Sequence, residues 1–485
     1  MATLEELKAE RIKKLEALEK QGLVGYPSES KRTHTLAEVM SDFENLKTKE
    51  VEVIVAGRVM ASRGQGALAF IDLYDGTTKM QAVIKLPESP ESVLYFYKEY
   101  VDMGDFIEVT GKLFNTKVGQ ESVLVSNVTM LSKALLPLPD KHSGLQDEEL
   151  RMRLRYLDML TTPELRETFE KKAKFWEVIR AFLKEKGFLE VDTPTIETTT
   201  GGAEARPFAT HHNDFDLDVY MRICVGELWQ KRLMAAGFPR TYEIGRAYRN
   251  EGSSPEHVQE FTNCEFYMAY ANYNDGMKLV EELYRKIAND VFGKTEFTTR
   301  GHTFDLANEW KRVDYREEIL RQTDIDIETA SDEDIKNELN KLKVKYDGEN
   351  RERLTDTIWK YCRKNISGPA FLINHPLLVA PLAKKNADNK TAQIFQPILA
   401  GSEIGKGYSE LNDPIDQRKR FEVQQALLAS GDEEAMMADW DFVEMLEHGM
   451  PPTCGFGFGE RLFAFLCDKP IREVQMFPLV KPKQD

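Results

Sequence analysis

Long apolar runs are missing from this sequence. No stretch approaches the roughly 20 consecutive apolar residues that a membrane-spanning helix needs. Residues 1–22, MATLEELKAERIKKLEALEKQG, are charged where a signal peptide would be apolar. We therefore expect a soluble, cytoplasmic protein with no membrane partner.

Cysteine is also scarce, and the few cysteines present are scattered. They form no CxxC pair and have no histidine-rich companion segment; they are Cys224, Cys264, Cys362, Cys454 and Cys467. This spacing gives no signal of a disulfide framework or of a zinc site. We expect reduced and mostly buried thiols.

Basic residues are outnumbered by acidic ones. The 65 Lys and Arg residues against 81 Asp and Glu residues give a formal net charge of -16. Such a balance argues against a protein whose whole surface contacts phosphates. A local basic groove is still compatible with it, because net charge is a sum over the whole chain.

The chain is long for a single hydrophobic core. It has 485 residues, of which 41% are hydrophobic, so two or more domains are expected. A polar, proline-bearing joint, LLPLPDKHSGLQDEELRMRLRYLDML, marks a change in composition. We place a helical extension at 1–50, a β-rich domain at 51–135, a linker at 136–160, and a large α+β domain at 161–485 with a helical insertion at about 325–366.

The β-rich domain contains five short strand-like runs. They are VEVIVAGRVMA, ALAFIDLYD, KMQAVIK, DFIEVTGKLF and ESVLVSNVTML, with a helical piece, ESVLYFYKEYV, between the third and the fourth. Five strands with a helix inserted at that point predict an OB barrel. Such barrels often bind oligonucleotides through aromatic and amide side chains on strands two and three, although the fold alone does not establish this function.

Two polar strands are predicted between residues 240 and 267. In RTYEIGRAYRNE, alternation puts Gly245, Ala247, Arg249 and Glu251 on one face, and after the loop GSSPEHVQE it does the same for Phe261, Asn263, Glu265 and Tyr267. The pair indicates an antiparallel hairpin with a polar floor. The Arg249 fork suits phosphate or carboxylate and the Phe261 ring suits a purine, although an Arg-x-Glu strand alone is more often a surface ion pair.

A third element, PPTCGFGFGERLFAFL, is a glycine-spaced strand that runs into an apolar helix. Glycines let a ligand approach the backbone, and Arg461 at the junction would face that ligand. Glycine in a strand also marks bulges or tight packing, so the glycine-spaced strand alone is weak evidence for a ligand site. The order of the three elements along the chain is stronger evidence.

In this order and spacing, the hairpin and the glycine-spaced strand resemble motifs 2 and 3 of class II aminoacyl-tRNA synthetases. The segment FEKKAKFWEVIRAFLKEKGFLEVDTPTI, with Pro194 near its end, resembles motif 1, the dimer-forming element. The barrel, the joint and GGAEARPFATHHNDFDLDVYMRI are similar to lysyl-tRNA synthetases of the OB-bearing subclass, so the resemblance covers nearly the whole chain. It implies an antiparallel-sheet catalytic domain with helices, a homodimer, and ATP, L-lysine and the tRNA for lysine as substrates.

The resemblance also implies roles around the nucleotide. Arg249 would bridge the amino-acid carboxylate and the ATP α-phosphate, with Glu251 and His257 along the nucleotide. Phe261 would stack under adenine, and Arg461 would cover its other face. The catalytic residues that the resemblance implies are Arg249, Glu251 and Arg461, and catalysis would consist of positioning and of charge stabilisation by Arg249, Arg461 and Mg²⁺. No general base is required, because the lysine carboxylate is already an anion at pH 7 and attacks phosphorus in line with the leaving pyrophosphate.

Substrate choice follows from charge, since lysine carries two ammonium groups and the chain offers several carboxylates. By the resemblance, Glu227 and the backbone near Gly202 hold the α-amino group, and Glu410 with the Tyr267 hydroxyl holds the ε-ammonium. The lysine-binding set implied in full is Gly202, Glu227, Arg249, Glu265, Tyr267, Tyr408 and Glu410.

The resemblance further implies about one to three Mg²⁺ ions, with Glu403 as the principal ligand. Strand alternation puts Glu403 on the parity opposite to Tyr408 and Glu410, so we predict a bulge at Gly405. On the barrel, Phe70 and Gln81 correspond to side chains that stack on and bond to anticodon bases.

Some positions depart from the family pattern. Lys406 stands where Asn is usual near the substrate carboxylate, and it would either pair with that carboxylate or repel the ammonium. Gln396 replaces a carboxylate that helps to bind additional Mg²⁺, and a neutral amide is a weaker ligand. The segment RICVGE is one residue longer than usual, and motif 3 is one residue shorter between Gly459 and Arg461.

Three other interpretations compete with lysine activation. A class II synthetase for aspartate or asparagine conflicts with Glu227 and Glu410, which would face an anionic or neutral side chain. A ligase that attaches lysine to a protein conflicts with the barrel. An inactive paralogue that only binds RNA would be expected to lose Arg249, Glu251 or Arg461, and all three are present.

Overall fold

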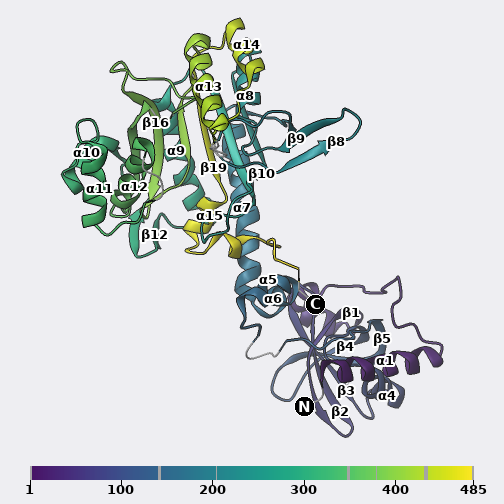
Figure 1. Ribbon diagram of the computed structural model, residues 1–485. Coiled ribbons are helices and arrows are strands. Elements are labelled where there is room, and N and C mark those ends of the chain that lie inside the picture. The colour runs from purple at the N-terminus through teal and green to yellow at the C-terminus, as the bar shows by residue number, and fades with distance from the viewer. Residues whose placement is uncertain are drawn as a thin grey trace. The chain divides into compact units, whose positions relative to one another are not determined.

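The structure is a computed structural model that describes residues 3–139, 144–203, 205–346, 350–377, 380–430 and 435–482. Residues 140–143 of the predicted linker and 347–349 of the predicted insertion lie outside the described residues. The chain forms two compact units (Figure 1): Met1–Arg151 with Tyr156–Thr161, and Met152–Arg155 with Thr162–Asp485. No helix in the described part of the chain is both long and apolar enough to cross a membrane.

The first unit is built around a closed five-stranded barrel in the order β1-β2-β3-β5-β4. Its elements are α1 (Leu4–Lys20), α2 (Leu36–Ser41), α3 (Phe43–Thr48), β1 (Glu52–Gln65), β2 (Leu68–Tyr74), β3 (Lys79–Lys85), α4 (Glu91–Tyr100), β4 (Phe106–Asn115), β5 (Glu121–Ser132), α5 (Glu148–Arg153) and α6 (Arg155–Thr161). The five predicted strands and the helix between the third and the fourth are all observed. The OB barrel prediction is therefore confirmed.

Alternation along the strands separates the inside of the barrel from the outside. In β2 the side chains of Ala69, Ile71 and Leu73 are buried, and Phe70 between them is only half-buried. Apolar residues at every second position therefore fill the barrel, since successive side chains of a strand point to opposite faces. On the outward face, the side chains of β2 are half-buried, whereas Gln81 and Val83 of β3 are buried.

The second unit contains a large, mostly antiparallel sheet in the order β14-β15-β16-β18-β19-β11-β10-β6, with β17 paired to β16. The strands of this sheet are β6 (Leu189–Glu190), β10 (Arg240–Tyr248), β11 (Glu260–Ala269), β14 (Lys311–Asp314), β15 (Ala370–Pro376), β16 (Thr391–Leu399), β17 (Ser402–Glu403), β18 (Lys406–Ser409) and β19 (Thr453–Gly459). Two smaller sheets are formed by β7 (Ile196–Glu197), β8 (Ala209–His212) and β9 (Leu217–Met221), and by β12 (Glu296–Thr299) and β13 (His302–Asp305). The predicted α+β class with an antiparallel-sheet domain is confirmed.

Helices surround this sheet (Figure 1). They are α7 (Pro163–Glu185), α8 (Glu227–Ala235), α9 (Tyr273–Ile287), η1 (Ala288–Phe292), α10 (Tyr315–Thr323), α11 (Asp332–Lys341), α12 (Arg351–Arg363), α13 (Pro414–Ala429), α14 (Trp440–His448), α15 (Arg461–Leu466) and η3 (Ile471–Val474). Helices α11 and α12 lie within the segment that was predicted to be helical, and α10 joins their apolar cluster.

The two faces of the sheet differ in polarity. On β11, Phe266 and Met268 pack into the main apolar cluster with Leu283 of α9. The alternate residues of the same strand include Glu265 and Tyr267, which line a cavity on the other face. One face is therefore core and the opposite face is available for a ligand, as strand alternation requires.

Candidate active site

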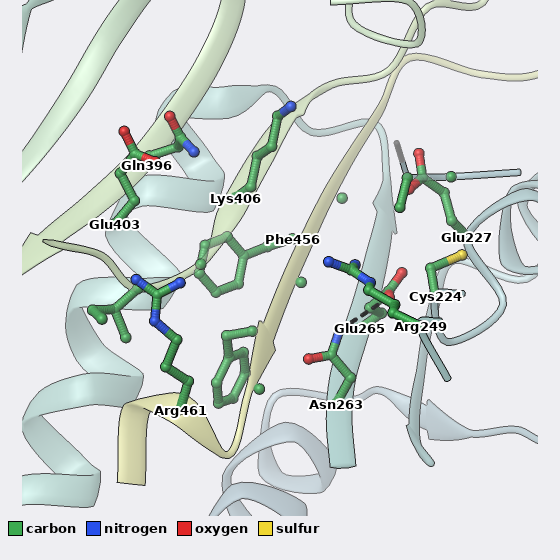
Figure 2. A pocket seen from close by; sticks show the side chains of 18 of the residues that line it. Cys224, Glu227, Arg249, Asn263, Glu265, Gln396, Glu403, Lys406, Phe456 and Arg461 are labelled. Carbon is green, nitrogen blue, oxygen red and sulfur yellow. Dashed lines mark hydrogen bonds between the residues drawn. The ribbon is translucent and has the colours of Figure 1, made fainter. Parts of the chain in front are cut away.

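A cavity of about 430 Å³ lies on the polar face of the large sheet. Every site residue that was predicted in this unit lines it: Gly202, Glu227, Arg249, Glu251, His257, Phe261, Glu265, Tyr267, Glu403, Tyr408, Glu410 and Arg461. Figure 2 shows Glu227 and Glu265 near Arg249 at one end, and Glu403 near Arg461 at the other. The volume is typical of small-molecule sites.

The floor of the cavity depends on the glycines of β19. In the register of β11 and β19, Glu265 is opposite Gly457 and Tyr267 is opposite Gly455. A Cβ atom at Gly455 would lie 2.4 Å from Glu410 Oε1 and 2.4 Å from Tyr267 Cε1. Any side chain there would therefore displace the groups that form the floor.

Arg249 and Glu251 are not on the strand where alternation had placed them, so that prediction was wrong in detail. Strand β10 ends at Tyr248. The ladder ends because Asn250 N donates to Arg206 O (2.8 Å) instead of bonding across the hairpin. Arg249 remains anchored, since its N donates to Gln259 O (2.8 Å) and its guanidinium lies 5.3 Å from the centre of the Phe261 ring.

Arg461, the first residue of α15, is held by a residue that the sequence analysis missed. Its Nη2 atom lies 2.6 Å from Glu256 Oε2, and Glu256 also pairs with Arg300. Burial would raise the pKa of Glu256, but the two guanidinium groups hold it below its ordinary value. The sequence signal was weak, because Glu256 is one of two carboxylates in the loop between β10 and β11 and matches no motif residue.

His257 neighbours this ion pair. Its Nδ1 atom lies 2.8 Å from Ser254 Oγ. Burial, and then the positive charge of Arg461, lower the pKa of His257. The imidazole is therefore neutral at pH 7 and can accept or donate a single hydrogen bond beside a nucleotide.

The opposite end of the cavity is a cluster of buried carboxylates. Glu227, Glu265 and Glu410 are 6%, 5% and 2% exposed. Val225 N donates to Glu265 Oε1 (2.8 Å), and the Tyr267 hydroxyl donates to Glu265 Oε2 (3.3 Å). Burial raises the pKa of Glu265 to about 7 and that of Glu410 to about 8. These carboxyl groups therefore favour a cationic ligand that would stabilise their ionised forms.

Lys231 was also missed, and it contacts two members of this cluster. Its Nζ atom lies 2.7 Å from Glu227 Oε1 and 2.6 Å from Glu410 Oε2. The sequence signal was weak, because Glu227 and Lys231 are four residues apart on a helix, as many surface ion pairs are. Only the fold shows that Lys231 is fully buried.

The bulge predicted at Gly405 is confirmed. Ile398 of β16 pairs with Glu403 on β17, whereas Phe395 of β16 pairs with Gly407 on β18. The pairing register with β16 therefore shifts by one residue between β17 and β18. Gly405 has φ +125°, a value that glycine adopts more easily than other residues. The irregularity lets Glu403 line the same cavity as Tyr408 and Glu410.

At the Arg461 end of the cavity, Glu403 could hold a metal ion. Trp359 Nε1 donates to its Oε1 (2.6 Å), and Arg363 Nη1 lies 2.8 Å from its Oε2. Each carboxylate oxygen keeps a second lone pair. Mg²⁺ at nucleotide sites commonly takes one or two carboxylates together with substrate phosphates, so Glu403 fits one such ion.

Gln396 and Lys406 lie on neighbouring strands of the cavity wall. The Gln396 Oε1 atom is 2.5 Å from His375 Nε2, so the amide is already engaged. Among the residues that the structure describes, no carboxylate forms an ion pair with Lys406. Its ammonium is therefore available to an anionic ligand in the cavity.

On the barrel, Phe70 and Gln81 share the outward face of β2 and β3. Phe70 is opposite Val83, and Asp72 is opposite Gln81, so Phe70 and Gln81 are diagonal neighbours. Gln81 is largely buried, and its Oε1 atom accepts a hydrogen bond from Ser122 Oγ (3.1 Å). Phe70 is thus the more accessible of the two.

An OB barrel, together with an antiparallel sheet that carries Arg249, Arg461 and a polar cavity, defines a class of enzyme. Residues 147–481 match the family of class II tRNA synthetases (D, K and N), and residues 53–131 match the OB-fold nucleic acid binding domain. The chain belongs to the class II tRNA synthetases.

Full-length relatives narrow the family further. The chain is 42% identical to the lysine–tRNA ligase of Thermotoga maritima, over 99% of this chain and 97% of that protein. It is 41% identical to the lysine–tRNA ligases of a Roseiflexus species and of Shouchella clausii, again over 99% of this chain and 99% and 98% of those proteins. Within its class, the chain therefore groups with the lysine–tRNA ligases.

Proposed function

We propose that this protein is a lysine–tRNA ligase, which activates L-lysine with ATP to lysyl-adenylate and pyrophosphate and then transfers lysine to the 3′ end of its tRNA. The observation that carries the proposal is the arrangement of the cavity. One end has three buried carboxylates, Glu227, Glu265 and Glu410, and the other end has the guanidinium of Arg461. A dicationic amino acid and a polyanionic nucleotide fit these two ends.

Arg249 borders the carboxylate end of the cavity, near Glu227 and Glu265, and has the central role. Its fork can bind the lysine carboxylate and the ATP α-phosphate together, which holds the nucleophile close to the phosphorus. Phe261 offers its ring to adenine, Arg461 covers the other face, and Glu251 and His257 border the nucleotide. Catalysis then consists of positioning and of stabilising the charge that develops on the phosphates.

The lysine end accounts for specificity. Glu227 and the backbone at Gly202 hold the α-ammonium, and Glu410 with Tyr267 holds the ε-ammonium. An aspartate side chain would meet like charge there, and asparagine would leave the cavity-facing oxygen of Glu410, Oε1, without an ammonium to pair with. The competing assignments to those amino acids are therefore disfavoured.

One Mg²⁺ ion on Glu403 would add positive charge at the phosphates when it is bound. Lys406 supplies a further cation on the same wall, and Gln396 offers only an amide that His375 already engages. We propose that this chain works with few metal ions, and that Lys406 contacts the carboxylate or phosphate oxygens at the centre of the cavity.

The barrel, residues 51–135, is proposed to bind the anticodon, with Phe70 stacking on a base and Gln81 beside it.

Homodimer formation is proposed as well, through the motif 1 region. Leu189 and Ile196, which follow α7, are 50% and 56% exposed. Analytical ultracentrifugation of the wild type and of Ile196→Asp would test the dimer.

Exchange of label between pyrophosphate and ATP, measured with each of the twenty amino acids in turn, tests the activity. Exchange with lysine alone supports the proposal. Exchange with another amino acid would reassign the substrate, and no exchange with any of them would favour the inactive, RNA-binding paralogue.

A further inference from the structure

Lys231 is a buried cation that the function described so far does not use. It lies on α8, is 0% exposed, and does not line the cavity. Its Nζ atom is 2.7 Å from Glu227 Oε1 and 2.6 Å from Glu410 Oε2, and it lies 5.3 Å from the centre of the Tyr408 ring. The ammonium therefore sits behind the cavity wall and joins two carboxylates that come from distant parts of the chain.

Such a charge is costly to bury unless it is paired. Burial would lower the pKa of Lys231, but Glu227 and Glu410 hold it above its ordinary value, so the ammonium stays charged. The two carboxylate oxygens lie close together because both contact one nitrogen. Without Lys231 they would repel each other in a poorly solvated place.

Each carboxylate uses one oxygen for Lys231 and keeps the other for the cavity. The second oxygen of Glu227, Oε2, is 2.9 Å from the position that a Cβ atom on Gly202 would take. The second oxygen of Glu410, Oε1, is 2.4 Å from the corresponding position on Gly455. Both glycines line the cavity. The Tyr408 hydroxyl also donates to Glu227 Oε1, so Lys231 and Tyr408 together turn Glu227 Oε2 toward the substrate, and Lys231 does the same for Glu410 Oε1.

The charges at this end of the cavity also balance through Lys231. When a bound cationic ligand keeps Glu227, Glu265 and Glu410 ionised, these groups carry three negative charges, and Lys231 contributes one positive charge. The remainder is two negative charges, which is the complement of the two ammonium groups of lysine. If Lys231 were absent, the site would have one carboxylate more than the substrate could pair.

We propose that Lys231 is a positioning residue for lysine: it holds one oxygen each of Glu227 and Glu410 from behind the cavity wall, directs their other oxygens to the substrate ammonium groups, and sets the charge of the pocket. This inference rests on the proposed function, because it assumes lysine as the bound amino acid. Lys231 touches no substrate, so it acts through the two glutamates.

The test replaces Lys231 with methionine and measures lysine-dependent pyrophosphate exchange. The KM for lysine should rise by about 30-fold or more, the usual result of truncating one partner of a buried charge pair. The KM for ATP should stay within about threefold, and kcat should change much less than the lysine KM, since the nucleotide end is intact.

The barrel provides a matched control. Lys133 is also buried, and its Nζ atom contacts Asp102 and lies 2.7 Å from Asp105 Oδ2. Lys133→Met thus removes the same kind of charge bridge from the other unit. It should lower the melting temperature to a similar extent while leaving the lysine KM unchanged. If Lys231→Met does not fold, Lys231→Arg and Lys133→Arg make the same comparison with the charge kept but displaced.

The outcomes separate the two claims. A wild type without lysine-dependent exchange overturns the proposed function, and the inference with it. A wild type that is active with lysine, combined with a Lys231 variant whose lysine KM matches that of its Lys133 control, overturns the inference alone. A rise in lysine KM that is confined to the Lys231 variant supports it.

Discussion

Replacement of Glu410 by glutamine is the sharpest single test of the lysine pocket. The change removes a charge while it keeps the shape of the side chain, so it leaves no cavity. Glu410 is 2% exposed, and its Oε1 atom faces the floor at Gly455. In the proposed complex this oxygen binds the ε-ammonium of lysine.

The size of the effect follows from burial. An ammonium and a carboxylate about 4 Å apart attract each other by about 4 kcal/mol at an effective dielectric constant of about 20. Truncation of one partner of a buried pair typically costs about 2 to 5 kcal/mol. Lys231 remains in the variant and would then repel the substrate. We expect a loss of about 3 to 4 kcal/mol, or about two to three orders of magnitude in kcat/KM for lysine.

Pyrophosphate exchange at varied lysine concentration measures this loss, and the KM for ATP serves as an internal reference. Norleucine, which lacks the ε-ammonium, should be rejected by the wild type by about four orders of magnitude. The preference for lysine over norleucine should be much smaller in Glu410→Gln.

Glu108→Gln supplies the matched control, because Glu108 is a buried glutamate of the barrel that accepts hydrogen bonds from Ser30 Oγ and Lys31 N (both 2.6 Å). It should leave lysine exchange unchanged. A Glu410→Gln enzyme with a lysine kcat/KM within about threefold of the wild type would refute the assignment of Glu410, as would an equal loss in affinity for ATP.

Three further predictions follow from the same geometry. Burial raises the pKa of Glu265 to about 7 and that of Glu410 to about 8, and bound lysine stabilises the ionised form of both groups. The affinity for lysine should therefore increase from pH 6 to pH 8, and binding should release protons. Calorimetry in buffers of different ionisation enthalpy measures this release, and an uptake of protons would contradict the prediction. Arg461→Ala should lower kcat for exchange by about 100-fold or more through lost charge stabilisation at the phosphates, and an unchanged kcat would remove Arg461 from the mechanism. Phe70→Ala should lower kcat/KM for tRNA by about one to two orders of magnitude, as expected for one stacked base, and an equal loss in pyrophosphate exchange, which needs no tRNA, would argue for misfolding instead.

Much of the architecture was predictable from local pattern. The five barrel strands, the helix between the third and the fourth, and the strand that carries Gly455 and Gly457 all appear where alternation, β-propensity and glycine spacing indicated. These signals are local, since a strand with one buried face needs apolar side chains at every second residue. The bulge at Gly405 needed the motif resemblance as well, because the resemblance put Glu403 and Tyr408 in one site and alternation allows this only if it is interrupted.

The assembly of the site came from motif resemblance, not from spacing alone. Glu227, Arg249, Glu410 and Arg461 are spread over more than 200 residues of sequence. No periodicity in the sequence predicts that their side chains meet in one cavity. The order of the motifs and the presence of the barrel identified the family, and the family pattern then assigned the site residues.

Tertiary structure alone decided the charge partners. The sequence by itself determined the two kinds of domain and the residue types available for chemistry. It did not determine that Lys231 is buried between Glu227 and Glu410, or that Glu256 holds Arg461. An ion pair depends on where two backbones bring their side chains and on how much water remains between them. Both quantities are set by the packing of the whole unit. A Glu and a Lys four residues apart on a helix have the spacing of a surface pair, and only the fold shows that Glu227 and Lys231 are buried.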